Sequence, residues 1–384
     1  MELRIYDEQI EHLGAVDEID SLIWKIMYFD VGTFRLLAPI TENNKKLLIE
    51  GNIVVKHDDK HEIADGEGNT WRRAAQITYK HISKNEKGME QIEAQGYMLS
   101  RWLNKRCIEP QIVMTGSNQR IINKMVRDNC GDGAGAKRRF PRFIMMDQES
   151  QENGEVEYAN QIYAKLGSEV KARAQAGKLG YDILINEKEG RYGFYLYKGR
   201  DFTAKNSKGN TPCIFSRDFD NVNEQEYIAS IENYGNFIYV QGMADGNGIQ
   251  PVVTVDGAGA SGLELTEVYC EATDITRKYK ENGIEYEIPI ESYLQMLATR
   301  GSAELETYGE VVNFTSTINA DSNLVFKKDF DVGDRVTCKE VSWGIQIDVR
   351  ITEATETYQK GVEKIEITFG ESLPTLADQI RKVR

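Results

Sequence analysis

The stretch from Asp329 to Gly370 reads DFDVGDRVTCKEVSWGIQIDVRITEATETYQKGVEKIEITFG and decides how the fold is interpreted. Along its middle, apolar and polar side chains alternate: Ile345, Ile347, Val349 and Ile351 against Gln346, Asp348, Arg350 and Thr352. Successive side chains of a strand point to opposite faces, so this pattern predicts a strand with one apolar and one polar face. We expect its acidic side chains to form an outward row on a barrel wall, not a chemical site.

Two turns divide this stretch into strands. VGD at residues 332–334 reverses the chain and leaves Val332, Val336 and Cys338 on one face, and QKGVEK leads into the final strand IEITF. The sequence thus predicts several consecutive strands that pair with one another.

Composition and charge bound the function. The chain has 384 residues, 40% apolar and 28% charged, which is typical of a soluble globular protein with several domains. No uncharged apolar run approaches the roughly 18 residues of a membrane span, and MELRIYDEQIEH lacks the pattern of an export signal. Five widely spaced cysteines fit a reducing cytoplasm. A net charge of −14 argues against a protein that gains affinity by neutralising nucleic-acid phosphates.

Changes in periodicity predict a mixed α+β, β-rich fold: two antiparallel β-barrel domains with inserted α/β elements. Short strands fill the first hundred residues, followed by a short helix in SRWLNKRCI. Helices are expected at 117–131, at 156–180 with a bend near Gly167, and at 291–308, and a hairpin at 181–203.

The expected division has four parts, and each has a distinct pattern. These are an N-terminal β-barrel domain at 1–112, completed by strands from about 201–262; an α/β domain with two helices and a hairpin at 113–200; a β-rich inserted region ending in a helix at 201–309; and C-terminal β-barrel strands with a short terminal helix at 310–384.

A glycine-rich loop at 130–140, CGDGAGAKRRF, invites comparison with a phosphate-binding loop. That motif needs a glycine before its lysine and a hydroxyl after it, whereas Ala136 precedes Lys137 and Arg138 follows. Its basic and aromatic side chains could instead grip a nucleic-acid strand: Lys137, Arg138, Arg139, Arg142, Phe140 and Phe143. The favoured interpretation is a solvated charge cluster that pairs with an acidic neighbour, given the charge of the whole chain.

Other candidate sites are weak. His57 and His61 are four residues apart on an expected strand, which would separate them by roughly 13 Å, too far for one metal ion. A calcium loop from Asp218 and Asp220 lacks the required glycine and glutamate, and ADGNGIQ at 244–250 fits less well, so both are expected to be turns. All histidines lie in the first region: His12, His57, His61 and His81. The sequence predicts no catalytic residue, no cofactor and no metal site.

Several stretches resemble one family in family order: MELRIYD, SLIWKIMYFDVGTFRLLAPITENNKKLLIEGNIV, EAQGYMLSRWLNKRCI, FYLYKGRDFT, PCIFSRDFDNVNEQEYIASIENYGNFIYVQG and VGDRVTCKEVSWGIQIDVRITEATETYQKGVEKIEITFG. They are similar to siphophage tail-tip hub proteins of phages of Gram-positive bacteria, the tail-associated, baseplate-hub-like group. Residues 242–262 match least well.

The resemblance implies a baseplate-hub-like fold and a homotrimer whose six barrels continue the hexameric tail tube and convert its symmetry to threefold. The implied partners are the tail tube, distal tail and tape-measure proteins and receptor-binding or spike proteins, with DNA only in transit and no membrane segment. The protein would be made in the host bacterial cytoplasm and reside at the tail tip of the virion. Many members carry a C-terminal extension with fibre or hydrolase modules; this chain stops at Arg384, so that activity is not carried over.

The resulting hypothesis is a structural hub that gates the exit of tape-measure protein and DNA, not an enzyme. Carboxylates along its channel would keep DNA from sticking, because like charges repel. Two alternatives stay open: a tail-tip module that binds the host surface, and a cell-wall hydrolase that acts during entry.

Overall fold

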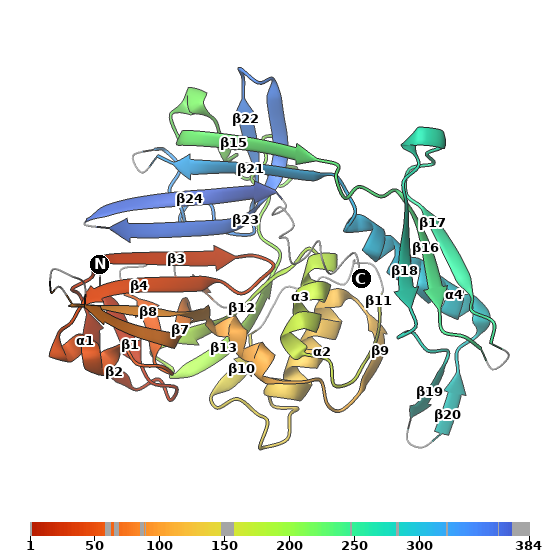
Figure 1. The fold of residues 1–384 in the computed structure, drawn as a ribbon, viewed down its shortest axis with the longest axis horizontal. Coiled ribbons are helices and arrows are strands. Elements are labelled where there is room, and N and C mark those ends of the chain that lie inside the picture. Colours follow the sequence, from red (N-terminus) through yellow and green to blue (C-terminus); the bar gives the residue numbers. More distant parts are fainter. Residues whose placement is uncertain are drawn as a thin grey trace.

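A computed structural model of the chain describes residues 2–57, 63–64, 69–84, 88, 90–146, 157–245, 248–281, 284–319, 322–359 and 361–370. Figure 1 shows two β layers on the left, with the N-terminal strands below the C-terminal ones. Helices lie in the centre of this view, and a small sheet with its own helix stands on the right. The predicted β-rich α+β class is therefore confirmed.

The N-terminal layer consists of short strands and one helix: β1 (Leu3–Tyr6), β2 (His12–Val16), β3 (Ser21–Met27), β4 (Thr33–Pro39), α1 (Glu42–Leu47), β5 (Ile53–Lys56), β6 (Ile63–Ala64), β7 (Thr70–Lys84) and β8 (Glu90–Met98). The strands pair antiparallel in the order β2–β1–β5–β7–β8–β4–β3, with β6 beside β7. β3 buries Leu22, Trp24 and Ile26 on one face, as its alternating sequence predicts.

The C-terminal layer contains the stretch that decided the sequence interpretation. Its elements are β14 (Ile214–Phe215), η2 (Arg217–Phe219), β15 (Val222–Ser230), β21 (Val311–Ile318), β22 (Arg335–Glu340), β23 (Ile345–Gln359) and β24 (Val362–Gly370). They pair in the order β14–β22–β23–β24–β21–β15. β23 also pairs antiparallel with β3, which places Glu356 opposite Trp24 and joins the two layers through backbone hydrogen bonds.

One hydrophobic core is shared by both layers. It contains Trp24 and Phe34 from the N-terminal strands and Phe314, Phe330 and Phe369 from the C-terminal part of the chain. Fully burying each large apolar side chain contributes about 1.5–3 kcal/mol. The two layers therefore cannot separate without exposing this core.

The α/β region follows the N-terminal layer: η1 (Leu99–Lys105), β9 (Ile112–Gly116), α2 (Asn118–Cys130), β10 (Phe143–Met145), β11 (Glu157–Gln161), α3 (Leu166–Ala176), β12 (Gly180–Asn186) and β13 (Arg191–Tyr197). α2 forms as predicted, because the Ser117 hydroxyl accepts a hydrogen bond from the Arg120 backbone N–H and apolar residues recur on one helix face. The hairpin of β12 and β13 is also confirmed, and β12 pairs with β7.

The helix predicted over 156–180 is wrong in its first half. Residues Glu157–Gln161 form β11, which pairs with β9, and only Leu166–Ala176 are helical. Tyr163 between them has a φ of 59°, which a helix does not permit. The distant partner strand β9 decides the conformation of this segment, overriding its local helical pattern.

The inserted region forms its own small unit: β16 (Phe237–Gly242), β17 (Val252–Asp256), η3 (Gly262–Glu264), β18 (Glu267–Ala272), β19 (Lys278–Glu281), β20 (Ile284–Glu287) and α4 (Ile290–Glu306). Its sheet has the order β17–β16–β18, and α4 packs Tyr293 and Leu297 on Ile238 and Val240. A Cβ at Gly301 would come within 2.6 Å of the Val240 side chain, so glycine permits this close approach.

The expectation that strands from 201–262 complete the N-terminal barrel is corrected by the pairing. β14 and β15 pair with C-terminal strands, and β16 and β17 belong to the separate sheet. The long polar loops around these short strands left their partners unspecified in the sequence. The domain boundaries themselves stay a prediction.

A register shift in β23 corrects the predicted outward row of acids. Before it, Gln346 and Asp348 are exposed, as expected. The pairing with β24 slips between Ile351 and Glu353, and beyond the slip Thr352, Ala354 and Glu356 are buried. A bulge of this kind moves every following side chain to the other face.

Among the described strands, each strand from β2 to β15 is hydrogen-bonded to the next one in the sheet order. No pairing among them joins the two edge strands of a layer into a closed barrel. Two closed barrels therefore stay a prediction, and the predicted short terminal helix lies outside the described residues. Among the helices in the described part of the chain, none has the length and apolarity needed to cross a bilayer.

Candidate functional site

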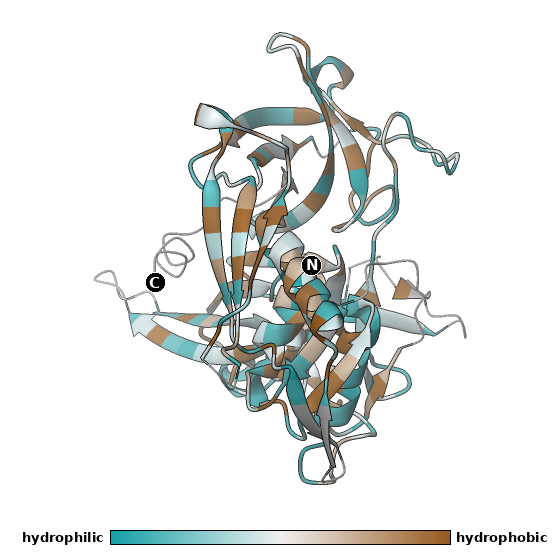
Figure 2. Cartoon of the chain, turned by 90° about the vertical axis from the view of Figure 1, so that its right-hand side faces the viewer, coloured by the Kyte–Doolittle hydropathy of each residue, from teal (hydrophilic) through white to brown (hydrophobic). Residues whose placement is uncertain are grey.

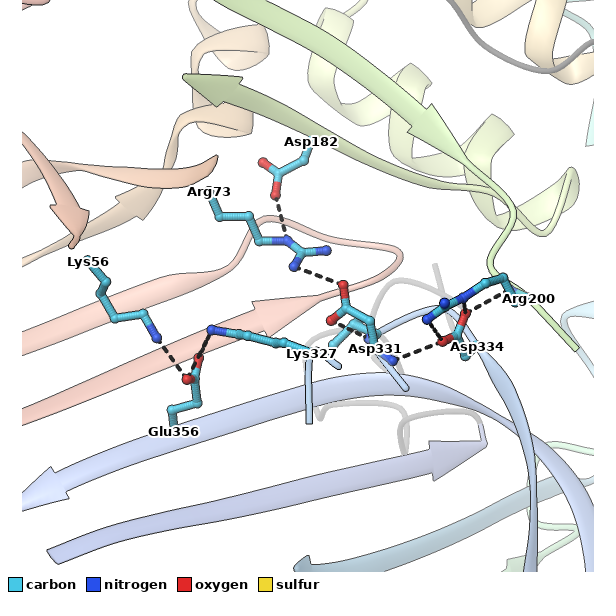
Figure 3. Close-up of polar contacts among 9 residues, drawn as sticks. Lys56, Arg73, Asp182, Arg200, Lys327, Asp331, Asp334 and Glu356 are labelled. Atoms are coloured by element: carbon cyan, nitrogen blue, oxygen red, sulfur yellow. Dashed lines mark hydrogen bonds and ion pairs between the residues drawn. The ribbon is translucent and has the colours of Figure 1, made fainter. Parts of the chain in front are cut away.

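A cluster of charged side chains, most of them buried, lies where the two β layers and the hairpin meet (Figure 3). We call it the ionic seam, and it consists of Lys56, Arg73, Asp182, Arg200, Lys327, Asp331, Asp334 and Glu356. Its members come from β5, β7, β12, β23 and the segments that precede β14 and β22.

Glu356 is the centre of one half of the seam. Its carboxylate lies 2.8 Å from Lys56 Nζ and 3.0 Å from Lys327 Nζ, and the side chains of Glu356 and Lys56 are each only 4% exposed. The Tyr358 hydroxyl donates to the same carboxylate, and Lys56 Nζ lies 5.4 Å from the ring centre of Trp24. Buried charges of this kind are tolerated only when they are paired and hydrogen-bonded.

Arg73 is the centre of the other half. Its guanidinium lies 3.1 Å from Asp331 Oδ2 and 3.5 Å from Asp182 Oδ2, and all three side chains are buried. The Asp331 backbone N–H donates to Asp334, which also accepts from Arg200 at 2.8 Å. One chain of contacts thus connects β7, β12 and the turn before β22.

Two carboxylates, Asp331 and Asp182, share the single Arg73 guanidinium. Burial raises the pKa of Asp182 to about 6, against the opposing effect of Arg73. For Arg73, burial alone would lower the pKa, but the negative charges of Asp331 and Asp182 outweigh it and hold the pKa above its usual range. Arg73 is therefore a permanent cation, and Asp182 takes up a proton in mildly acidic solution.

The ionic seam has a structural role: its ion pairs and hydrogen bonds hold separate chain segments together. Each carboxylate is engaged by a cation or by backbone N–H groups. Removing one partner of such a pair costs about 3–5 kcal/mol, because the other charge is left buried. The seam therefore holds the layers and the hairpin in one relative arrangement.

A second polar contact reinforces the same junction. The guanidinium of Arg350 lies over the Tyr28 ring, 5.0 Å from its centre, and donates to Lys198 O at 2.7 Å and also to Gly333 O. The Tyr28 hydroxyl in turn donates to Lys178 O at 2.9 Å. Three separate chain segments are fixed by these two side chains.

The basic loop is mainly structural. Arg138 binds Glu109, the Cys107 carbonyl and the Asn129 side chain. Arg139 donates to backbone carbonyls of the same loop, and the loop follows helix α2, unlike a phosphate loop, which follows a strand. The pairing with Glu109 agrees with the favoured interpretation of a charge cluster beside an acidic neighbour.

Phe140 and Phe143 are only 6% and 8% exposed and pack edge to face. They are therefore not available to stack on nucleic-acid bases. Lys137 is exposed and lines an open pocket of about 510 Å³.

The other candidates remain separate. His57 faces Arg4 at 2.9 Å, and His61 lies outside the described residues. Asp218 and Asp220 lie in and directly after the short turn η2, and Asp245 closes a turn by accepting from the Ile249 backbone N–H. Within the part of the chain that the structure describes, no cluster of three metal-ligating side chains occurs.

Sequence reasoning missed every member of the seam. Lys56 ends an otherwise apolar strand and Glu356 follows a bulge, so neither position shows an unusual pattern by itself. Arg73 and Asp182 interrupt buried strands with a charge, and that was the one available signal. Arg73 is 258 residues from Asp331 in sequence and Lys56 is 300 residues from Glu356, and no local spacing encodes such pairs.

Comparisons with known proteins agree with this structure. The family model described as Siphovirus ReqiPepy6 Gp37-like protein matches residues 2–371. No curated protein matches the chain.

Three crystal structures share its fold. A tail protein from Neisseria meningitidis is 12% identical, with a TM-score of 0.59 over 96% of both chains. The prophage tail protein gp18 from Listeria monocytogenes is 11% identical, with a TM-score of 0.54 over 100% of this chain and 98% of that one. A 43 kDa tail protein of prophage MuSo2 from Shewanella oneidensis is 10% identical, with a TM-score of 0.55 over 96% and 98%.

Proposed function

Because the chain belongs to the Siphovirus ReqiPepy6 Gp37-like protein family and has the fold of phage tail proteins, we propose that it is the structural hub of a tail tip. In this role a homotrimer joins the hexameric tail tube to threefold distal components. The two β layers would complete two barrels per chain, so that three chains give six walls around one axis. It is a virion protein and not an enzyme.

The observation that carries this proposal is the joint between the two layers. β3 and β23 form one continuous sheet across it, and the ionic seam lies buried beside the strand pair. A wall that transmits load along a tube needs such a joint, because a flexible linker would let the two layers rotate independently. The shared hydrophobic core supports the same conclusion.

The proposed neighbours are the tail tube, distal tail and tape-measure proteins, and receptor-binding or spike proteins. Tape-measure protein and DNA would leave through the axis when host contact shifts the assembly. The net charge of −14 supports passage without retention, since like charges shorten the contact of DNA with the wall. The boundaries of the four parts, at 112, 200 and 309, belong to this proposal as well, without the completion of the N-terminal barrel by strands from 201–262.

Locating the chain in the particle tests the proposal. An affinity tag on the chain, detected by a labelled antibody in electron micrographs of purified virions, should mark the tail axis at the distal end. Quantitative mass spectrometry should give three copies per tail. Labels on the head, or along the sides of the tube, would refute the hub role.

A further inference from the structure

The small inserted sheet leaves one of its faces uncovered. α4 packs on the other face and contacts β11, whose Asn160 donates to Thr276. Figure 2 views the molecule from the side on which this sheet stands, with hydrophobic and hydrophilic residues mixed along the strands. The uncovered face therefore points away from the rest of its own chain.

We call this surface the open face. It consists of three rows across the strands, and its residues are Phe237, Asp256 and Glu267; Tyr239, Thr254 and Tyr269; and Gln241, Val252 and Glu271. Three carboxylates and no cation occur among these residues. The face is thus apolar and aromatic in its middle and negative toward two sides.

The two tyrosines of the open face are held in position. Tyr239 donates to Glu267 at 2.7 Å and Tyr269 to Gln241 at 2.5 Å, and both rings keep substantial exposure, 38% and 56%. Fixed, exposed tyrosines lose little conformational entropy on binding and are enriched at protein interfaces. The carboxylates beside them select a positively charged partner.

The same chain carries a surface of the opposite sign. An open pocket of about 510 Å³ is lined by Lys105, Arg106, Cys107, Glu109, Lys137 and Arg138. Glu109 pairs with Arg138, Lys105 lies 3.9 Å from Glu8 with 51% of its side chain exposed, and Lys137 is exposed. We call it the basic pocket, and its residues belong to η1, to the segment that follows η1 and to the loop after α2, none of which is part of the β16–β18 sheet.

We propose that the open face of one copy docks on the basic pocket of a second copy of this chain. The two surfaces are complementary in charge, and they point in different directions within one chain. Such a head-to-tail contact repeats around a ring when the rotation closes. This inference rests on the proposed oligomeric hub and assigns the surfaces that join its subunits.

Charge reversal tests the contact in the full-length protein. One variant carries Glu267→Lys with Glu271→Lys, a second carries Lys105→Glu with Lys137→Glu, and a third carries all four substitutions. Sedimentation velocity, alone and with the neighbouring tail proteins, measures self-association. Each two-site variant should lose at least about tenfold in affinity, and the four-site variant should recover it, because the reversed charges attract again.

The matched control is Glu18→Lys with Glu50→Lys, which changes the net charge equally at two exposed sites outside both surfaces. It should leave association unchanged, and circular dichroism verifies that every variant is folded. Added salt should weaken the parent association.

The outcomes separate the two proposals. A trimer that is unaffected by both reversals refutes the docking surfaces and leaves the hub role standing. Loss only with the Glu267 and Glu271 pair, without recovery in the four-site variant, shows that another cationic protein occupies the open face. A parent chain that stays monomeric under every condition, including with tail proteins, refutes both.

Discussion

Replacing Glu356 with glutamine tests whether the ionic seam holds the two layers together. The substitution keeps the shape of the side chain and removes its charge. Lys56 and Lys327 would then remain buried within about hydrogen-bond distance of a neutral amide, at 4% and 8% side-chain exposure. Removing one partner of a buried ion pair costs about 3–5 kcal/mol. Two lysines depend on this carboxylate and would also repel each other, so we expect the upper part of that range.

Native-state hydrogen exchange is the suitable assay, because a chain of this size need not unfold in a single step. Amides of β3 and β23 report the free energy of opening at the joint between the layers. In the Glu356→Gln protein, exchange through opening should accelerate by a factor of several hundred to a few thousand, as expected from this energy range. Amides of α4 in the inserted region should not change.

Glu42→Gln is the matched control, since Glu42 pairs with Lys45 at the surface and the same atoms are exchanged. It should leave the exchange of β3 and β23 unchanged, because exposed pairs contribute little. If Glu356→Gln alters opening at the joint by less than about 1 kcal/mol, the seam does not fasten the layers and the argument built on its burial is wrong.

Three further changes probe other parts of the molecule. Asp182→Asn removes a group whose pKa rises from 3.8 to about 6 on folding, so the parent loses about 2–3 kcal/mol relative to the variant between pH 4 and pH 7, measured as the difference of the opening free energies of β12 amides in native-state hydrogen exchange. Leu297→Ala should cost about 2–5 kcal/mol within the inserted unit, seen as faster exchange of β16 amides with β23 unaffected. Arg350→Lys keeps the charge but loses the planar fork over Tyr28, and thermal unfolding should show a loss of about 1–3 kcal/mol.

The sign of the Asp182 effect follows from its raised pKa. The folded state binds the proton of the Asp182 carboxyl group more tightly than the unfolded chain does. The protonated carboxyl group therefore makes its full contribution to the stability of the folded state below the unfolded pKa of 3.8, and this contribution is lost as the pH rises through about 6. Taking the difference from the asparagine variant cancels the other titrating groups. A difference that stays constant between pH 4 and pH 7 would show that Asp182 is already ionised throughout.

Local pattern was sufficient where a segment decides its own conformation. Helix α2, the hairpin of β12 and β13, and helix α4 follow from short-range signals and were predicted from them. It failed where a distant partner decides, as in β11, whose helical pattern yields to pairing with β9. The partners of β14 and β15 were also misassigned, because strands of this kind carry no mark of the sheet to which they belong.

Glu356 of the ionic seam shows why the sequence pattern assigned an acidic side chain of β23 to the wrong face of the strand. From Ile345 to Ile351 the alternation is correct, and extending it by two-residue steps places Glu356 on the side of Gln346 and Asp348, which are exposed. The slip before Glu353 interrupts that count, and the pairing of β23 changes from β22 to β3 at the same point. Because of this one irregular residue, Glu356 is the buried counter-ion of two lysines and not an exposed carboxylate on the outer face of the strand. It lies where the two β layers meet. A buried charge there discourages any alternative register, since a further slip would leave Lys56 and Lys327 without Glu356. The irregularity is therefore what fixes the relative position of the layers, and the tube wall that we propose depends on that position being unique.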